Sequence, residues 1–91
     1  MIEVRLTLRP RAGKAKEVQQ TLESVTAAIL TQWGCTGCDF QAAGDGRSFS
    51  VVQSWSDHAA ADAYLKSREH RALIGAIGTL CDEHTLSITN R

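Results

Sequence analysis

Two cysteines separated by two residues, Cys35 and Cys38, are the first side chains in this sequence whose spacing could support chemistry. A Cys-x-x-Cys pair can form a redox couple, and it can also supply half of the ligands of a zinc ion. A zinc site would need two further ligands, for which the chain offers Cys81 and its 3 histidines. The local structure expected around the pair decides whether either chemistry is supported.

The elements expected on either side of the cysteines argue against both chemistries. In redox sites of the thioredoxin type, the cysteines lie at the N-terminus of a helix, whose dipole lowers the thiol pKa. Here the pair follows a predicted helix and enters a predicted strand, residues 35–42. Because side chains alternate along a strand, Cys35 and Cys38 should point to opposite faces and could share an ion only across a bulge. We therefore predict buried, reduced, structural cysteines and no metal site, unless the strand assignment is wrong.

His70 is the next residue that could act chemically, because an unperturbed histidine titrates near neutral pH and can serve as a base. The alternative is an exposed histidine that opens a helix. Tyr64 could donate a proton, or it could be a half-buried aromatic residue. Trp55 could form the wall of a substrate pocket, although a core this small has use for so large a ring in any case. His58 and His84 are expected at the surface.

The length and charge of the chain limit the classes of function. Ninety-one residues predict a single domain, residues 1–91, with a core small enough to benefit from self-association. Lysine plus arginine and aspartate plus glutamate each number 10, so the formal net charge is zero. The absence of a basic block argues against nucleic acid and against an anionic membrane as partners. With no signal peptide or apolar span in the sequence, we expect a cytoplasmic protein.

The apolar pattern predicts the order strand, helix, strand, strand, helix, strand. Alternation marks the first strand, and spacings of three and four mark the first helix, with Gly34 as its left-handed cap. Ser56 is placed to cap the second helix, and glycines at 75 and 78 predict that this helix is kinked or divided between His70 and Thr79. The expected ranges are 2–8, 14–33, 35–42, 48–55, 57–79 and 85–89, with a turn at 43–46.

This order is typical of the α+β class, namely a ferredoxin-like split βαβ fold with a four-stranded antiparallel sheet. Two helices cover one face of such a sheet. Because both faces of strand 48–55 carry apolar residues, the other face is expected to meet a partner. A homodimer with sheets packed face to face satisfies this need.

The sequence resembles the antibiotic biosynthesis monooxygenase (ABM) family over nearly its whole length. The resemblance rests on Gly34-Cys35 at the start of a strand, Val51-Val52-Gln53-Ser54-Trp55-Ser56 at the end of another, the helix 59–65, and Glu69-His70-Arg71. It implies a dimeric αβ barrel. It also implies oxygenation of aromatic polyketide or quinol substrates without metal or flavin, whereas other relatives degrade haem or isomerise small metabolites.

The resemblance also implies site residues. Trp55 matches the tryptophan that ends the third strand in the family, His70 matches a histidine of the second helical segment, and Tyr64 stands where relatives carry histidine or tyrosine facing the pocket. Phe49 and Val51, on the same strand face as Trp55, are expected to line that pocket with it.

Two departures from the family pattern narrow the function. The first strand lacks the asparagine of the haem-degrading members, since Asn90 is the only asparagine in the chain. The acidic residue that commonly precedes the tryptophan is also missing, with Gln53 and Ser54 in its place. Haem degradation and any mechanism that uses that carboxylate are therefore not supported.

The sequence thus predicts a cofactor-independent monooxygenase that acts with dioxygen on a small aromatic, phenolic or quinol-type compound between helices and sheet. His70 or Tyr64 would assist removal of a phenolic proton, and no cofactor would be bound. The alternative is a non-catalytic dimeric module of the same fold that binds a small molecule, because few ionisable residues can be placed in the pocket.

Overall fold

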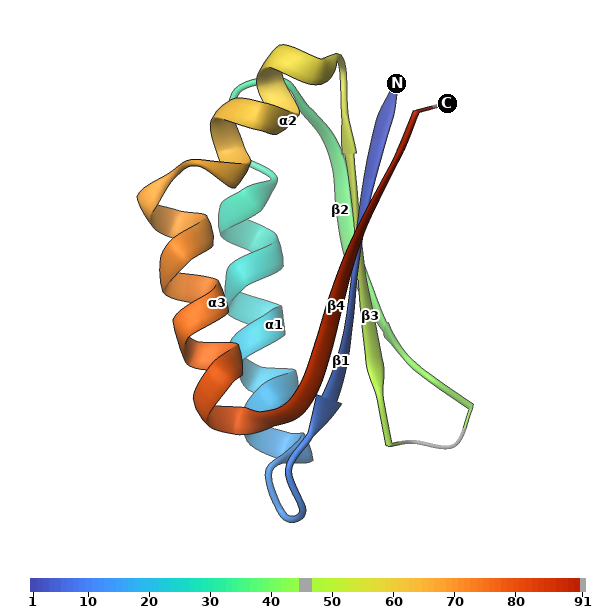
Figure 1. The fold of residues 1–91 in the computed structure, drawn as a ribbon, viewed down its shortest axis with the longest axis vertical. Helices are drawn as coiled ribbons and strands as arrows, with labels where there is room; N and C mark the ends of the chain where they lie inside the picture. Colours follow the sequence, from blue (N-terminus) through green and yellow to red (C-terminus); the bar gives the residue numbers. More distant parts are fainter. Residues whose placement is uncertain (45–46, 91) are drawn as a thin grey trace.

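The chain folds into a four-stranded sheet with helices on one face, in a computed structural model that describes residues 1–44 and 47–90 (Figure 1). In chain order the elements are β1 (Ile2–Pro10), α1 (Ala15–Ile29), β2 (Cys35–Ala42), β3 (Phe49–Trp55), α2 (His58–Leu65), α3 (Arg68–Leu80) and β4 (Cys81–Asn90). The sheet order is β2-β3-β1-β4, and every neighbouring pair is antiparallel. The predicted ferredoxin-like α+β fold is confirmed.

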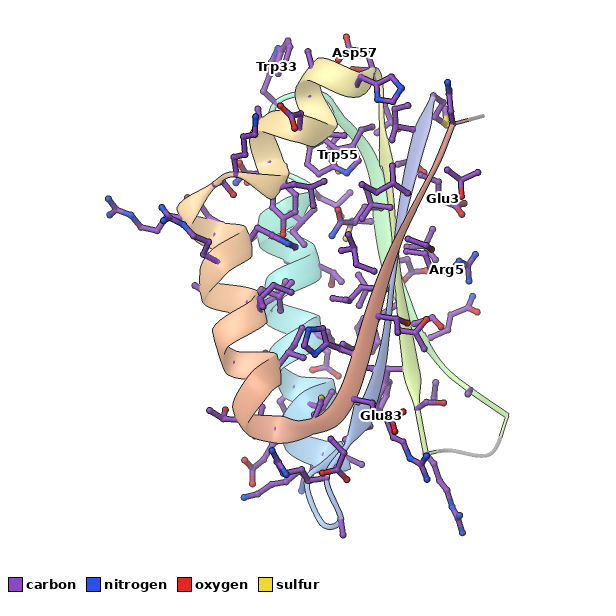
Figure 2. All side chains as sticks on the ribbon, viewed as in Figure 1. Glu3, Arg5, Trp33, Trp55, Asp57 and Glu83 are labelled. Carbon is purple, nitrogen blue, oxygen red and sulfur yellow. The ribbon has the colours of Figure 1, made fainter. Side chains whose placement is uncertain are left out.

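Strand β1 lies at the centre of the sheet because its alternate residues are apolar. Ile2, Val4, Leu6 and Leu8 are at most 2% exposed and face the helices. The intervening residues face the opposite side, where Figure 2 shows Glu3 and Arg5 pointing away from the helices. The period of two therefore separates a buried face from an open face along this strand.

The core between sheet and helices consists of two clusters of buried residues. The first cluster gathers residues of β1, β3, α1 and α3, namely Leu6, Leu8, Val18, Leu22, Phe49, Val51, Leu73, Ile77 and Cys81. The second gathers residues at the other end of the sheet, namely Ile2, Val4, Ile29, Trp55, Ala60, Ala61 and Tyr64. Val25 and Cys38 pack against both clusters. The aromatic residues Trp55 and Tyr64 thus belong to the cluster beneath α2.

Helix α1 ends four residues earlier than the sequence pattern predicts. It stops at Ile29, and Trp33, expected on its apolar stripe, is 73% exposed. The backbone leaves the helix because Thr31 bonds to the Ala28 carbonyl through both its amide and its hydroxyl. A turn then closes at Gly34, which has the predicted positive φ, +80°. Residues 30–33, which the sequence pattern assigned to a last helical turn, instead form the turn that leads from α1 into β2.

Replacing Gly34 with alanine should destabilise the protein strongly. Its φ is +80°, and an added Cβ would collide with the Cβ of Ala60 in α2. A left-handed alanine costs about 1–2 kcal/mol, and overpacking adds about 1–3 kcal/mol, so we expect a loss of about 2–5 kcal/mol by urea denaturation. Gly13 is the matched control, because it has the same φ and no atom near its missing Cβ. Equal losses for Gly13→Ala and Gly34→Ala would contradict the packing argument.

The second helical segment is divided, but not at the glycines. The break lies at residues 66–67, where Ser67 begins α3 by accepting a hydrogen bond from the amide of His70 at 3.2 Å. Helix α3 then runs without a break through Gly75 and Gly78, both on its exposed side. The prediction of a kink or break between His70 and Thr79 is therefore wrong. The chain breaks before His70, where α2 ends and Ser67 caps the start of α3.

The remaining boundaries differ by a few residues from their expected positions. Asp57, and not Ser56, caps α2 by accepting from the amide of Ala60 at 2.9 Å. Strand β4 begins at Cys81, four residues before the expected start. The turn predicted at 43–46 connects β2 and β3, but Asp45 and Gly46 lie outside the described residues. In the described part of the chain, no helix has the length and apolar character needed to cross a membrane.

Candidate functional site

Strand β3 places two side chains that hold each other at the helix-facing side of the sheet. Trp55 and Gln53 are two residues apart, so both point toward the helices, and they are 0% and 1% exposed. The indole Nε1 of Trp55 donates a hydrogen bond to Oε1 of Gln53 at 3.1 Å. Figure 2 shows the Trp55 side chain between the sheet and α2. The indole therefore fixes which end of the Gln53 amide accepts and which end is left to donate.

Helix α2 brings Tyr64 onto this pair. The ring centroids of Tyr64 and Trp55 lie 5.0 Å apart with an interplanar angle of 23°, which is a stacked arrangement. Tyr64 is 3% exposed. Because the Asp57 cap fixes the start of this short helix, it also sets the position of Tyr64 about two turns later.

His70 reaches the same place from the first turn of α3. Its ring meets the edge of Tyr64 with centroids 5.3 Å apart and an interplanar angle of 68°. The residue is partly exposed, although its Nδ1 atom is buried. The imidazole therefore extends from the interior of the fold toward solvent. The Ser67 cap fixes the turn that carries it.

Three polar atoms of this cluster are buried without a hydrogen-bond partner among the described residues. They are Nε2 of Gln53, the hydroxyl of Tyr64 and Nδ1 of His70. A buried polar group left unpaired costs about 1–3 kcal/mol, so such groups are rare and need a reason. Here the three come from three elements, β3, α2 and α3, and belong to side chains linked through Tyr64. We call Gln53, Trp55, Tyr64 and His70 the polar cluster.

The protonation states of the polar cluster follow from its burial. Burial, and then the nearby Cys38 thiol, raise the pKa of Tyr64 to about 12. The nearby Gln53 side chain lowers the pKa of Tyr64, but by less than burial raises it. The amide and the hydroxyl are close, but their geometry is not that of a hydrogen bond. Burial also lowers the pKa of His70 below its ordinary 6.5. At neutral pH, Tyr64 is therefore a neutral donor and His70 a neutral imidazole that can accept a proton.

The two cysteines of β2 point to the same face, contrary to prediction. The register of β2 against β3 shifts between Cys35 and Gly37, where Cys35 pairs with Trp55 and Cys38 with Gln53. This bulge inserts one extra residue, so both thiols turn toward the helices. Both cysteines are free and partly buried. Within the described ranges, no group of three histidine, cysteine or acidic side chains is arranged to hold a metal ion.

Cys38 should react very slowly with thiol reagents in the folded protein. Burial, with smaller effects of Cys35 and Asp39, raises the pKa of Cys38 to about 12 from an ordinary 9.0. Only the thiolate reacts, so at pH 8 the alkylation rate with iodoacetamide should be at least about 100-fold lower than in urea. Peptide mass spectrometry measures the modified fraction at each cysteine. Similar rates for Cys38 in the folded and unfolded chain would contradict the burial of this thiol.

The structure divides the predicted pocket residues between the two core clusters. It brings Trp55, Tyr64 and His70 together. Phe49 and Val51 lie on the same face of β3 but pack in the other cluster, with Leu8 and Ile77. Gln53 was not among the residues predicted for the site. The sequence did hold a signal for Gln53. It is the one polar residue among the alternate positions of this strand that are otherwise Phe49, Val51 and Trp55.

The two larger hollows found on the surface of the described residues lie away from the polar cluster. One, about 340 Å³, lies on the open face of the sheet and is lined by Arg5, Asp39, Gln41, Ser50 and Val52, together with two alanines. The other, about 350 Å³, lies at the turn between β1 and α1 and is lined by arginines 9, 11 and 47 with Asp82 and small residues. Arg11 and Asp82 already form an ion pair at 3.0 Å.

Comparisons with known proteins place the whole chain in one fold and most of it in one family. A Deinococcus radiodurans protein described as a candidate antibiotic biosynthesis monooxygenase superimposes with a TM-score of 0.93 at 18% identity, covering 100% of this chain and 92% of that chain. Rv0793 from Mycobacterium tuberculosis gives 0.90 at 15% identity, covering 99% and 93%. A conserved Bacteroides thetaiotaomicron protein of unknown function gives 0.87 at 19% identity, covering 97% and 94%.

At these identities the structural matches show the fold alone. A comparison with curated protein sequences found no significant match. Family membership is shown by a family model described as "Antibiotic biosynthesis monooxygenase", which matches residues 1–76 and so spans β1 to most of α3, including the polar cluster. The resemblance noted in the sequence is thereby confirmed, and the chain belongs to the antibiotic biosynthesis monooxygenase family.

Proposed function

We propose that this protein is a cofactor-independent monooxygenase that acts on a small phenolic or quinol-type compound bound at the polar cluster. The observation that carries the proposal is the set of three buried polar atoms without partners, presented by side chains in contact around Tyr64. A ligand with a phenolic oxygen would satisfy them, because a neutral imidazole accepts its proton while a tyrosine hydroxyl and an amide donate to the oxygen. Family membership supports the reaction class.

The roles of the residues follow from their protonation states. Nδ1 of His70 takes the phenolic proton, and the high pKa of Tyr64, about 12, makes it a hydrogen-bond donor to the resulting anion. The electron-rich carbon of the anion, which carries a hydrogen, then adds to dioxygen, and the resulting peroxide anion takes the proton back from His70 to form a hydroperoxide. Loss of water leaves a carbonyl, so one oxygen atom enters the product and the other leaves as water. Trp55 positions two of these groups, because its ring stacks on Tyr64 and its indole N–H donates to Gln53.

Oxygen uptake with a panel of hydroquinones and anthrones tests this function. We expect consumption of one dioxygen per substrate oxidised, with the rate lowered in Tyr64→Phe and in His70 variants. Rates that are unchanged in both would remove these residues from the mechanism. Saturable binding of the panel without any oxygen uptake would instead favour a non-catalytic binding module. Absence of both binding and uptake would contradict the site itself.

The proposed function includes a homodimer in which the open sheet faces pack together. No described element covers that face (Figure 1). Val52 lies at its centre between Ser50 and Ser54, with Arg5 directly across in β1. This face is more polar than the sequence pattern implied, so the packing would combine apolar contact with hydrogen bonds. A native mass spectrum at micromolar concentration should give twice the chain mass of 9.9 kDa, and a monomer would contradict the dimer.

A further inference from the structure

Three side chains form a row across the open face of the sheet, the side that no described helix covers. The strand registers pair Asp39 of β2 with Val52 of β3, and Val52 with Arg5 of β1. Residues directly opposite each other in antiparallel strands point to the same side, and neighbouring strands lie about 4.8 Å apart. Figure 2 shows Arg5 on the side away from the helices. We call Asp39, Val52 and Arg5 the central row.

The two charges of the central row are open to a partner. Asp39 and Arg5 are exposed, and Val52 is partly so. Within the chain, Arg5 contacts Glu3 of the same strand at 3.7 Å, and its side chain stays 46% exposed. Asp39 accepts a hydrogen bond from the amide of Phe40 but has no ion-pair partner among the described residues. An acid and a base therefore stand on either side of β3 without neutralising each other.

The open face also has room for a side chain from another molecule. Arg5 and Asp39 both line the hollow of about 340 Å³ on this face, with Val52 and Ser50 between them. The other lining residues are Gln41 and two alanines, which are short or flexible. A long side chain that enters this hollow from above can reach the carboxylate of Asp39.

A two-fold axis that runs parallel to β3 above Val52 makes the central row self-complementary. Sheets packed face to face lie about 10 Å apart, and this rotation exchanges the two sides of β3. It places Arg5 of one protomer over the position of Asp39 in its partner, and the same contact recurs on the other side of Val52. A crossing angle of about 30° between the sheets displaces each end of the row by only about 2–3 Å, which an arginine side chain can span.

Other two-fold arrangements of the same faces lack this pairing. An axis in the interface plane but perpendicular to the strands would set Arg5 over its own copy and Asp39 over its own copy. Such contacts between like charges oppose association. Orthogonal packing of the sheets would set Arg5 over the serine positions of β3, two residues from Val52. The charge pattern therefore favours the axis parallel to β3.

We propose that a second copy of this chain docks on the open face about this axis, and that Arg5 of each protomer pairs with Asp39 of the other. This inference rests on the proposed function for the existence of the dimer, and it adds the rotation axis and the residues that fix it. Val52 is the one large apolar residue that the paired strands present on this face. The two ion pairs, more than apolar burial, therefore determine how the protomers are oriented.

The test reverses one charge in each of two variants and then mixes the variants. Arg5→Glu leaves two acids facing each other at every contact, and Asp39→Arg leaves two bases. Each variant alone should therefore have a dimer dissociation constant about 100-fold or more above that of the wild type, roughly tenfold for each of the two contacts. In the mixture every contact joins an acid to a base, so a heterodimer should form. Sedimentation equilibrium measures the dissociation constants, and native mass spectrometry identifies the heterodimer.

Arg71→Glu is the matched control, because it makes the same change of charge at an exposed position on α3. It should leave the dissociation constant of the dimer unchanged. Thermal melting reports whether each variant is folded. If a charge reversal prevents folding, Arg5→Gln and Asp39→Asn replace it, and each should weaken the dimer by about tenfold through the loss of two ion pairs without repulsion.

The possible results separate the parts of the proposal. Charge reversals that weaken the dimer no more than Arg71→Glu would overturn the contact between Arg5 and Asp39. Weakened variants that form no heterodimer on mixing would overturn the axis. A wild-type protein that is monomeric would overturn this inference together with the dimer of the proposed function. The experiment does not depend on oxygen uptake, so a failure of the monooxygenase activity is distinguished from a failure of the interface.

Discussion

Replacing Trp55 with alanine should lower the free energy of unfolding by about 3–5 kcal/mol, the usual cost of removing a large buried ring. Trp55 is 0% exposed, stacks on Tyr64 and supplies the only hydrogen bond seen for the Gln53 side chain among the described residues. Truncation leaves a cavity and a second unpaired end on the amide. Since a domain of this size has about 5–14 kcal/mol of stability, the loss is a large part of the total.

The melting temperature of Trp55→Ala should fall by about 12 °C or more, as followed by circular dichroism. The chain provides its own control in Trp33, which is 73% exposed. Figure 2 shows Trp33 pointing away from the sheet, in contrast to Trp55. Trp33→Ala should change the free energy of unfolding by less than about 0.5 kcal/mol. Equal losses in the two variants would contradict the assignment of Trp55 to the core.

Replacing His70 with glutamine should reduce the rate of substrate oxidation by about 10²- to 10⁴-fold, the range contributed by a positioned base. Glutamine keeps a polar group at this position, but its amide cannot accept the phenolic proton. Burial lowers the pKa of His70 from 6.5, so the wild-type rate should stay level down to about that pH and fall only below it. The residual rate of His70→Gln should lack this acidic limb. Initial rates of oxygen uptake across pH 5–8 measure both effects.

The lowered pKa of His70 should also make the stability of the fold depend on pH. A histidine whose pKa is lower in the folded state binds fewer protons there than in the unfolded chain. Stability should therefore fall as the pH drops from 6.5 toward the lower pKa of His70, and it should fall less in His70→Gln. His58→Gln is the control because His58 is exposed. If His58→Gln and His70→Gln had the same oxidation rate and the same pH dependence of stability, the proposed role of His70 as the base would be contradicted.

The strands and the order of elements could be predicted from the sequence because their signals are local. Alternation along β1 depends only on which residues are apolar, and β2 was predicted with its observed ends, Cys35 and Ala42. The ends of the helices depend on competition between neighbouring signals. Gly75 and Gly78 were expected to interrupt the second helix, but they lie on the exposed side of α3, which continues through them. The hydroxyl of Ser67 caps the start of α3 and so sets the break between α2 and α3.

The candidate site was predicted in part. Trp55, Tyr64 and His70 could be named from the family resemblance, and the structure puts them in contact. Gln53 could not be assigned a role, because nothing in the sequence says that the indole two residues later will hold its amide. The common face of Cys35 and Cys38 was also beyond prediction, since it depends on a bulge that arises in pairing with β3. Contacts between elements decide these features, and they become visible only once the fold is known.

The location of the ligand site is the central claim, and the two indole N–H signals of a ¹⁵N–¹H correlation spectrum test it most directly. The chain has 2 tryptophans, so Trp33→Phe assigns both signals. On addition of 4-nitrophenol or a hydroquinone, the Trp55 signal should shift in a saturable manner while the Trp33 signal stays in place. A shift confined to Trp33, or no shift of either signal at saturating ligand, would contradict a ligand site at the polar cluster.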